Sequence, residues 1–219
     1  MKKIGLYVLA IIAAVTIFAN FASAEKISDD TDDVYYWTWN ESLGTYKWAH
    51  SVTSKPNIDI TEISFTTNGQ QAILTMKVKG TIESSEKVTY LLYYNTTDVN
   101  YWMSYSNGTG FCMANSGTGM AWGNATASGD TITATVNLVP TGTKLAFWGF
   151  AAEYTSQFGD KSAEWWGDWA PQDESPWYGQ NGEEGGNGGG GGGGGTPGFE
   201  GAIFCMSLLV AFVILSRKK

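Results

Sequence analysis

Apolar and polar residues alternate with a period of two in the middle of the chain. Residues 72–79 (AILTMKVK) and 131–138 (TITATVNL) each place apolar side chains at every second position. Because successive side chains of a β-strand point to opposite faces, this period predicts strands that bury one face. Residues 88–94 and 144–151 are apolar at both parities, which is typical of buried central strands.

A fifth segment, residues 58–65 (IDITEISF), switches its apolar positions from even to odd numbers partway along. A strand that buries both sets needs an extra residue, so we expect a β-bulge within it. Short turn-forming sequences follow several of the predicted strands. Between residues 25 and 178, no stretch of similar length has apolar residues at helical spacing. The turns are expected at Asn68-Gly69, Ser128-Gly129-Asp130 and Pro140-Thr141-Gly142. The pattern predicts an all-β domain, an antiparallel β-sandwich of about seven to nine strands.

The N-terminal residues have the composition of a secretion signal. Lys2 and Lys3 precede an apolar stretch, and Ala22-Ser23-Ala24 supplies small residues where signal peptidase cleaves. We expect a helical signal peptide over residues 1–24 with cleavage after Ala24. The alternative is an uncleaved membrane helix.

The C-terminal residues form a short apolar run with a basic end. Residues 201–215 are apolar, and Arg217, Lys218 and Lys219 follow. As a helix the run is about 23 Å long, which is short for a permanent membrane span. The basic end favours the cytoplasmic side, which places the preceding residues outside the cell.

The same region resembles a known sorting signal. Residues 196–200 (TPGFE), the apolar run and the basic end together resemble the archaeal PGF-CTERM signal over residues 196–219, with the sorting signal itself at residues 197–219. The resemblance implies that an archaeosortase recognises Pro197, Gly198 and Phe199, removes the tail and leaves the protein attached to lipid at the cell surface, often near an S-layer. The preceding linker departs from the Thr/Pro/Glu mixture of many such proteins.

That linker, residues 179–196, is dominated by glycine, and we expect it to be disordered. Residues 25–178 then remain as one extracellular domain. The whole chain has a net charge of −8, and between Glu25 and Thr196 the balance of 8 basic and 20 acidic residues is 8 − 20 = −12. Such an acidic domain repels phosphate backbones, which argues against nucleic acid as a partner.

Few residues suit catalysis or disulfide formation. Of the two cysteines, Cys205 lies in the apolar run, so we expect Cys112 to be a buried thiol rather than a reactive one. The single histidine, His50, cannot form a histidine zinc cluster, and no catalytic residue is assigned. Acidic residues in the last third of the domain could serve glycoside hydrolysis, with surface carboxylates as the simpler reading. These are Glu153, Asp160 and Glu164.

Two groups of residues are candidates for binding. Tryptophans could stack sugar rings, although large aromatics also fill sandwich cores. The candidates are Trp165, Trp166, Trp169, Trp37 and Trp39. Four carboxylates within five residues could bind calcium, or form a solvated arm. They are Asp29, Asp30, Asp32 and Asp33, to which Asp59 and Asp168 could add only if the fold brings them near. No other cofactor is expected.

Glycosylation is also expected, because four Asn-x-Ser/Thr triplets occur in the predicted external domain. They begin at Asn40, Asn95, Asn107 and Asn124. The domain is loosely similar to carbohydrate-binding or DOMON-like surface sandwiches, through residues 56–60 (PNIDI), a paired hairpin, a Tyr-rich strand and the closing Trp169-Ala170-Pro171.

The sequence thus predicts a non-enzymatic surface protein that acts in envelope structure or binds glycans or neighbouring envelope proteins. The alternatives are a carbohydrate- or solute-binding module for uptake, and a glycoside-active enzyme. A binding module should expose a strip of aromatic side chains, whereas an enzyme should show converging carboxylates in a cleft.

Overall fold

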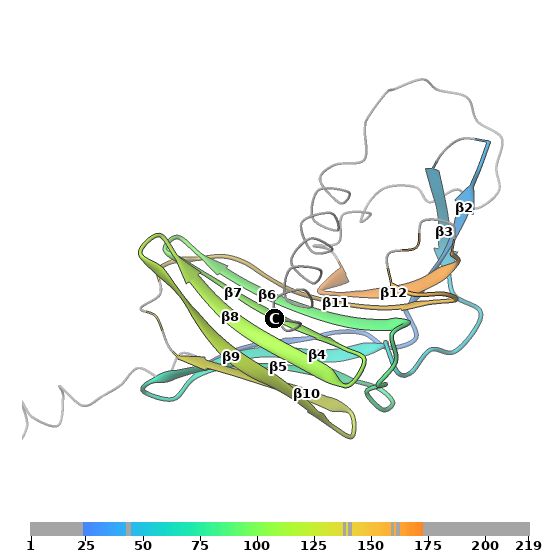
Figure 1. Ribbon diagram of the computed structural model, residues 1–219. Helices are drawn as coiled ribbons and strands as arrows, with labels where there is room; N and C mark the ends of the chain where they lie inside the picture. Colours follow the sequence, from blue (N-terminus) through green and yellow to red (C-terminus); the bar gives the residue numbers. More distant parts are fainter. Residues whose placement is uncertain are drawn as a thin grey trace, which may run out of the picture.

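The computed structural model describes residues 24–42, 45–137, 139, 142–158, 160 and 163–172 (Figure 1). The signal peptide, the glycine linker and the PGF-CTERM-like tail expected from the sequence lie outside these residues, except for Ala24. No described segment is a helix with the length and apolarity that crossing a membrane requires. The strands are β1 (Ala24–Ser28), β2 (Tyr35–Asn40), β3 (Thr45–His50), β4 (Ile60–Thr67), β5 (Gln71–Val78), β6 (Val88–Thr96), β7 (Val99–Ser106), β8 (Thr109–Ser116), β9 (Gly119–Ser128), β10 (Thr131–Asn137), β11 (Lys144–Tyr154) and β12 (Trp165–Ala170).

All twelve strands belong to one antiparallel sheet, in the order β1-β4-β5-β10-β9-β8-β7-β6-β11-β12-β2-β3. The predicted all-β, antiparallel class is therefore confirmed, while the predicted count of seven to nine strands is too low. The omitted strands include β7, β8 and β9, where apolar residues face both sides of the sheet and Gly, Asn and Ser interrupt the alternation. Such segments carry little period-two signal.

The sheet curls so that β4 and β5 lie opposite β6 and β11, which places the main core inside the curl (Figure 1). Gly149 on β11 shows how closely the two sides approach. A Cβ atom there would lie 2.8 Å from Ile63 Cγ2 and 3.0 Å from Met76 Cε. One curled sheet thus encloses the core, where the sequence led us to expect a sandwich.

The individual strand patterns hold in the structure. On β5 the alternate residues Ala72, Leu74, Met76 and Val78 are buried, and β10 buries its alternate apolar residues in the same way. The predicted bulge in β4 is present, because the pairing with β5 shifts register between Ile60 and Glu62. The change of parity lets the apolar residues on both sides of the bulge face the core.

The predicted tight turns also form where the structure describes them. Gly69, between β4 and β5, has φ +70°, and Gly129, between β9 and β10, has φ +61°. These left-handed conformations cost glycine little, which explains its place in both turns. The expected turn at residues 140–142 lies largely outside the described residues.

Two strands near opposite ends of the sheet, β4 and β12, meet at a contact that we call the seam. The backbone N–H of Ile60 donates a hydrogen bond of 2.6 Å to Asp168 Oδ2 across it. Residues 29–34 cross the seam, because β1 pairs with β4 on one side and β2 pairs with β12 on the other. Most of the acidic N-terminal segment is therefore held at the point where the sheet closes.

Candidate functional site

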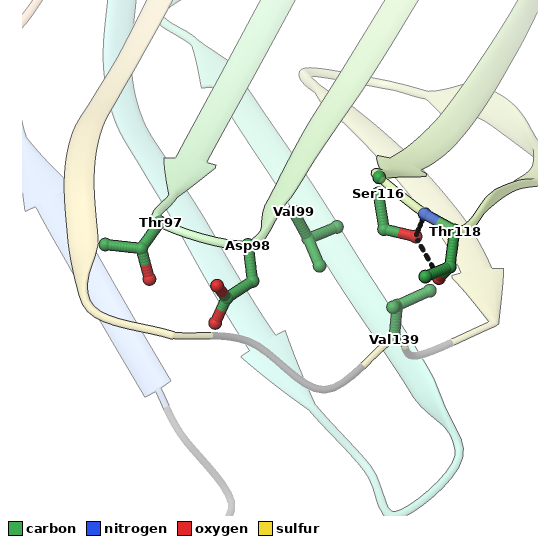
Figure 2. A pocket seen from close by; sticks show the side chains of 7 residues that line it. Thr97, Asp98, Val99, Ser116, Thr118 and Val139 are labelled. Atoms are coloured by element: carbon green, nitrogen blue, oxygen red, sulfur yellow. Dashed lines mark hydrogen bonds between the residues drawn. The ribbon is translucent and has the colours of Figure 1, made fainter.

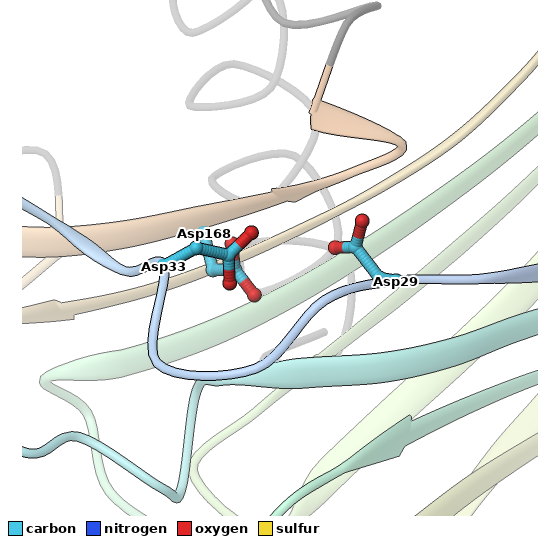
Figure 3. A group of neighbouring side chains, drawn as sticks. All are labelled: Asp29, Asp33 and Asp168. Atoms are coloured by element: carbon cyan, nitrogen blue, oxygen red, sulfur yellow. The ribbon is translucent and has the colours of Figure 1, made fainter.

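Three aspartates converge at the seam. Carboxylate oxygens of Asp29, Asp33 and Asp168 all lie within 4.8 Å of one another. Figure 3 shows that Asp29 and Asp33 come from the loop between β1 and β2, while Asp168 comes from β12. We call these three residues the seam carboxylates.

Asp168 is the most buried of the three, with 0% of its surface exposed. Its Oδ2 accepts the hydrogen bond from Ile60, and its Oδ1 accepts one of 2.8 Å from the backbone N–H of Trp169. Burial, and then the charge of Asp33, raise the pKa of Asp168 well above its ordinary value. Backbone N–H groups hold this side chain in place without neutralising its charge.

The other two seam carboxylates each keep one buried oxygen without a hydrogen-bond partner, Asp29 Oδ2 and Asp33 Oδ1. Burial, followed by repulsion from Asp33, raises the pKa of Asp29 to about 7. Burial is also the largest cause of the raised pKa of Asp33. Among the described residues, none of the seam carboxylates forms an ion pair with lysine or arginine. Uncompensated buried carboxylates need either protons or a bound cation.

Two more oxygen-bearing side chains contact the same loop. Asp59, whose side chain is 3% exposed, accepts a 3.0 Å hydrogen bond at Oδ2 from the backbone N–H of Asp32, while its Oδ1 is buried without a partner. The amide Nε2 of Gln172 donates to the Asp33 carbonyl oxygen at 3.3 Å, and its Oε1 is buried without a partner. The loop is therefore lined by oxygen atoms that lack donors.

The structure changes the set of acidic residues expected from the sequence. Asp29 and Asp33 come together, but Asp30 and Asp32 are exposed and lie outside the group. Asp32 adopts φ +67° and its Oδ1 lies 2.5 Å from Lys79 Nζ, so its side chain turns toward solvent. Asp168 takes their place, as the sequence had allowed if the fold brought it near.

The predicted tryptophan platform is mostly buried. Trp37, Trp165 and Trp169 are 6%, 1% and 8% exposed and belong to a second apolar cluster on the outer face of β2, β11 and β12. Trp166 points to the other face, where Lys55 Nζ lies 3.8 Å from its ring centroid, and Trp39 is half-buried on β2. These side chains pack against one another as a core does, so they leave little ring surface for a sugar.

Other side chains form a row on the same outer face, which the sequence alone did not identify, and two of them, Trp102 and Trp148, pack against the second apolar cluster. Cross-strand register joins these residues in one line from β11 to β9. They are Trp148, Tyr93, Trp102, Met113 and Trp122, which we call the outer aromatic row. Trp122 is 52% exposed, and the other four are half-buried. Adjacent strands lie about 4.8 Å apart, so five strands give a row of roughly 19 Å.

A row of asparagine side chains, the amide row, runs beside it, and each asparagine lies two residues from the row member on the same strand. Asn95, Asn100 and Asn115 lie opposite one another on β6, β7 and β8, on the same outer face. The Tyr93 hydroxyl donates a 3.2 Å hydrogen bond to Asn100 Oδ1, which connects the two rows. The parity of each strand can be read from the sequence, but the alignment of the rows depends on register and was not predictable.

The four glycosylation triplets lie in different environments. Asn107 and Asn124 are exposed, in the β7–β8 turn and on β9. Asn95 is half-buried in the amide row. Asn40, also half-buried, accepts a 3.1 Å hydrogen bond at Oδ1 from the backbone N–H of Ser42. Glycosylation at all four positions remains a prediction.

The carboxylates considered for glycoside hydrolysis have other contacts. Glu153 accepts a 2.6 Å hydrogen bond from Lys55 Nζ, and Asp160 accepts one of 2.7 Å from Ser156. Glu164 is exposed. His50 is exposed on β3, with its ring 4.5 Å from that of Tyr35.

A shallow hollow lies at the end of the sheet where the β6–β7 and β8–β9 turns meet (Figure 2). Ser116 Oγ accepts a hydrogen bond from the Thr118 backbone there, and Asp98 is its one acidic side chain. It is lined by Thr97, Asp98, Val99, Ser116, Gly117, Thr118 and Val139. Because it has a single carboxylate and no aromatic side chain, the hollow offers less for stacking a sugar than the outer aromatic row does.

The expected sorting residues, Pro197, Gly198 and Phe199, lie outside the described residues. No family model matches the chain, and neither a curated protein nor a solved structure matches it. The candidate sites are therefore defined by geometry alone, as the seam carboxylates inside the curl and the outer aromatic row on its opposite face.

Proposed function

We propose that this chain is an exported protein, held at the cell surface through its C-terminal sorting signal, whose non-enzymatic β domain binds extracellular carbohydrate along the outer aromatic row. The observation that carries the proposal is the register that lines up Trp148, Tyr93, Trp102 and Trp122 on one face. Aromatic faces offer apolar area with little loss of side-chain entropy, which suits them to stacking against sugar rings.

The amide row supports carbohydrate over a purely apolar ligand. Asn100 and Asn115 can donate and accept hydrogen bonds beside the rings, and sugars carry hydroxyl groups that need both. The row of roughly 19 Å favours a polymer over a single sugar. The net charge of −8 for the whole chain favours a neutral or cationic polysaccharide over an anionic one.

Surface display rests on the two ends of the chain. The basic, apolar N-terminal segment with its small residues suits signal peptidase, and residues 197–219 resemble a signal processed by an archaeosortase-like enzyme. Export would place the aromatic row among envelope glycans and envelope proteins. Cell fractionation tests this part: recovery of the protein in the cytosol with its leader intact would contradict it.

Binding can be tested with polysaccharide extracted from the envelope of the producing cells. We expect the full-length protein, purified in mild detergent, to co-sediment with it, and Trp122→Ala and Trp102→Ala to weaken binding by about tenfold, or ~1.4 kcal/mol. Val52→Ala is the control, because Val52 is a fully exposed apolar residue outside the row. Equal binding by all variants would remove the row from the proposal, and no binding by the native protein would favour a structural role.

A further inference from the structure

We propose that the seam carboxylates Asp29, Asp33 and Asp168 bind a divalent cation of the calcium class, which holds the curled sheet closed at the seam. The site and the outer aromatic row lie on opposite faces of the sheet, because Asp168 and Trp169 alternate along β12 and Trp169 stacks against Trp148 of the row. The first step is the convergence of three carboxylates within 4.8 Å (Figure 3).

The second, independent observation is the set of buried oxygens without donors around this group. Asp59 is not one of the three, yet its side chain is 3% exposed and its Oδ1 has no hydrogen-bond partner. Gln172 is only half-buried, but its Oε1 is buried and also lacks a hydrogen-bond partner, and both side chains contact the loop of residues 29–34. A buried acceptor without a donor costs about 1–3 kcal/mol, more when it is charged. The charge of Asp59 repels those of Asp29 and Asp33, so a cation bound to these two carboxylates would also offset the charge of Asp59.

The charge around the loop points the same way. Six carboxylates lie in or against it, and Lys79 is the cation that pairs with two of them, Asp32 at 2.5 Å and Asp59 at 3.8 Å. Among the described residues, Lys79 compensates the solvent side of the loop, and no lysine or arginine pairs with a carboxylate on the seam side. The six are Asp29, Asp30, Asp32, Asp33, Asp59 and Asp168.

The donor set favours calcium over other divalent cations. All candidate ligands are oxygens, which suits calcium and magnesium rather than zinc. Calcium accepts six to eight oxygen ligands in flexible geometry, whereas magnesium demands a near-ideal octahedron and usually keeps several waters. A site made of several carboxylates from a loop and a strand therefore suits calcium better.

The experiment uses the full-length protein in mild detergent, stripped with chelator and then titrated with terbium, a luminescent substitute for calcium. Trp169 follows Asp168 directly, so excitation of tryptophan should sensitise terbium bound at the seam. We expect sensitised emission that calcium displaces and that magnesium displaces only at much higher concentration. Calcium should also raise the Tm of the stripped protein.

Asp33→Asn is the main variant, because this residue is half-buried and its Oδ1 has no partner to lose. We expect its calcium affinity to fall by about tenfold or more, since affinity at such sites follows the number of charged ligands. Asp30→Asn is the matched control: it removes the same charge from an exposed position in the same loop. Asp29→Asn gives a second test if Asp33→Asn does not fold.

Each outcome of these measurements either supports or overturns the proposed calcium site. A calcium response that is lost in Asp33→Asn or Asp29→Asn and kept in Asp30→Asn supports the seam site. A native protein that shows neither terbium emission nor a change in Tm overturns the proposal. A response that all the variants share also overturns it, because calcium would then bind elsewhere. Polysaccharide binding is measured separately, so loss of one property does not decide the other.

Discussion

The buried carboxylate of Asp168 on β12 accepts a 2.6 Å hydrogen bond from the backbone N–H of Ile60 on β4. Because β4 and β12 are not neighbours in the order of the sheet, this bond joins two strands that the ladder itself does not connect. The same carboxylate accepts a second bond from Trp169. Asp168 is thus both a structural acceptor at the seam and a member of the carboxylate group.

Replacement of Asp168 should be costly even without a cation. Asp168→Ala leaves two buried N–H groups without acceptors, at about 1–3 kcal/mol each, whereas Asp168→Asn keeps one acceptor oxygen. We expect urea unfolding with chelator at pH 5 to show Asp168→Ala less stable than Asp168→Asn, and both less stable than the native protein. An Asp168→Ala protein of native stability would show that the bond to Ile60 contributes nothing.

The stability of the chelated protein should fall as pH rises. Burial raises the pKa of Asp29 from an ordinary value of 3.8 to about 7, so the folded state binds this proton more tightly than the unfolded state does. The stabilisation is present below about pH 4 and is lost as pH rises through 7. Urea unfolding at pH 5, 6, 7 and 8 measures this slope.

Added calcium should oppose that loss, because a cation favours the ionised carboxylates. The increase in Tm produced by calcium should therefore be small at pH 5 and larger at pH 8. Asp30→Asn should keep this pattern. A chelated protein whose stability rises with pH between 5 and 8 would contradict the raised pKa of Asp29.

Cys112 should be unreactive in the folded protein. It is fully buried on β8, and burial raises the pKa of its thiol to about 12, so almost no thiolate forms at pH 8. In a Cys205→Ser protein, where Cys112 is the remaining cysteine, a chromogenic disulfide reagent should react only after urea is added. Rapid reaction of the native protein would mean that the core opens more readily than its packing implies.

Gly149 should not tolerate a larger residue. The Cβ of alanine would meet Ile63 Cγ2 at 2.8 Å, and overpacking of this kind costs about 1–3 kcal/mol. Gly117→Ala is the control, since nothing lies within 4 Å of its added Cβ and its φ is not in the left-handed region. Urea unfolding should show a large loss for Gly149→Ala and almost none for Gly117→Ala.

The sequence predicted those parts of the fold that local pattern controls. The amino-acid sequence alone predicts the alternation of β5 and β10 and the change of parity in β4. It also predicts the turns at Gly69 and Gly129, and the structure contains all of these features. They were predictable because the side-chain period of a strand and the left-handed conformation of glycine are properties of a few adjacent residues.

The closure of the sheet and both candidate sites depend on residues far apart in sequence. Asp29 and Asp33 could be proposed as cation ligands from their spacing, but the choice of Asp168 over Asp30 depends on where β12 meets β4. The outer aromatic row depends likewise on the register of five strands, in which a shift by one residue would turn Trp102 to the opposite face.

The seam also means that the domain cannot finish folding until β12 has been synthesised. The loop of residues 29–34 and its partner Asp168 are near opposite ends of the domain, so the ribosome releases the first long before the second. At about 5–20 residues per second, the delay is on the order of 10 s. During that interval β4 can pair with β1 and β5, but β12 is not yet there to contact it across the seam, so the incomplete sheet stays open. Truncation before Trp165 should therefore trap the chain in this unfinished state, however well its earlier hairpins have formed.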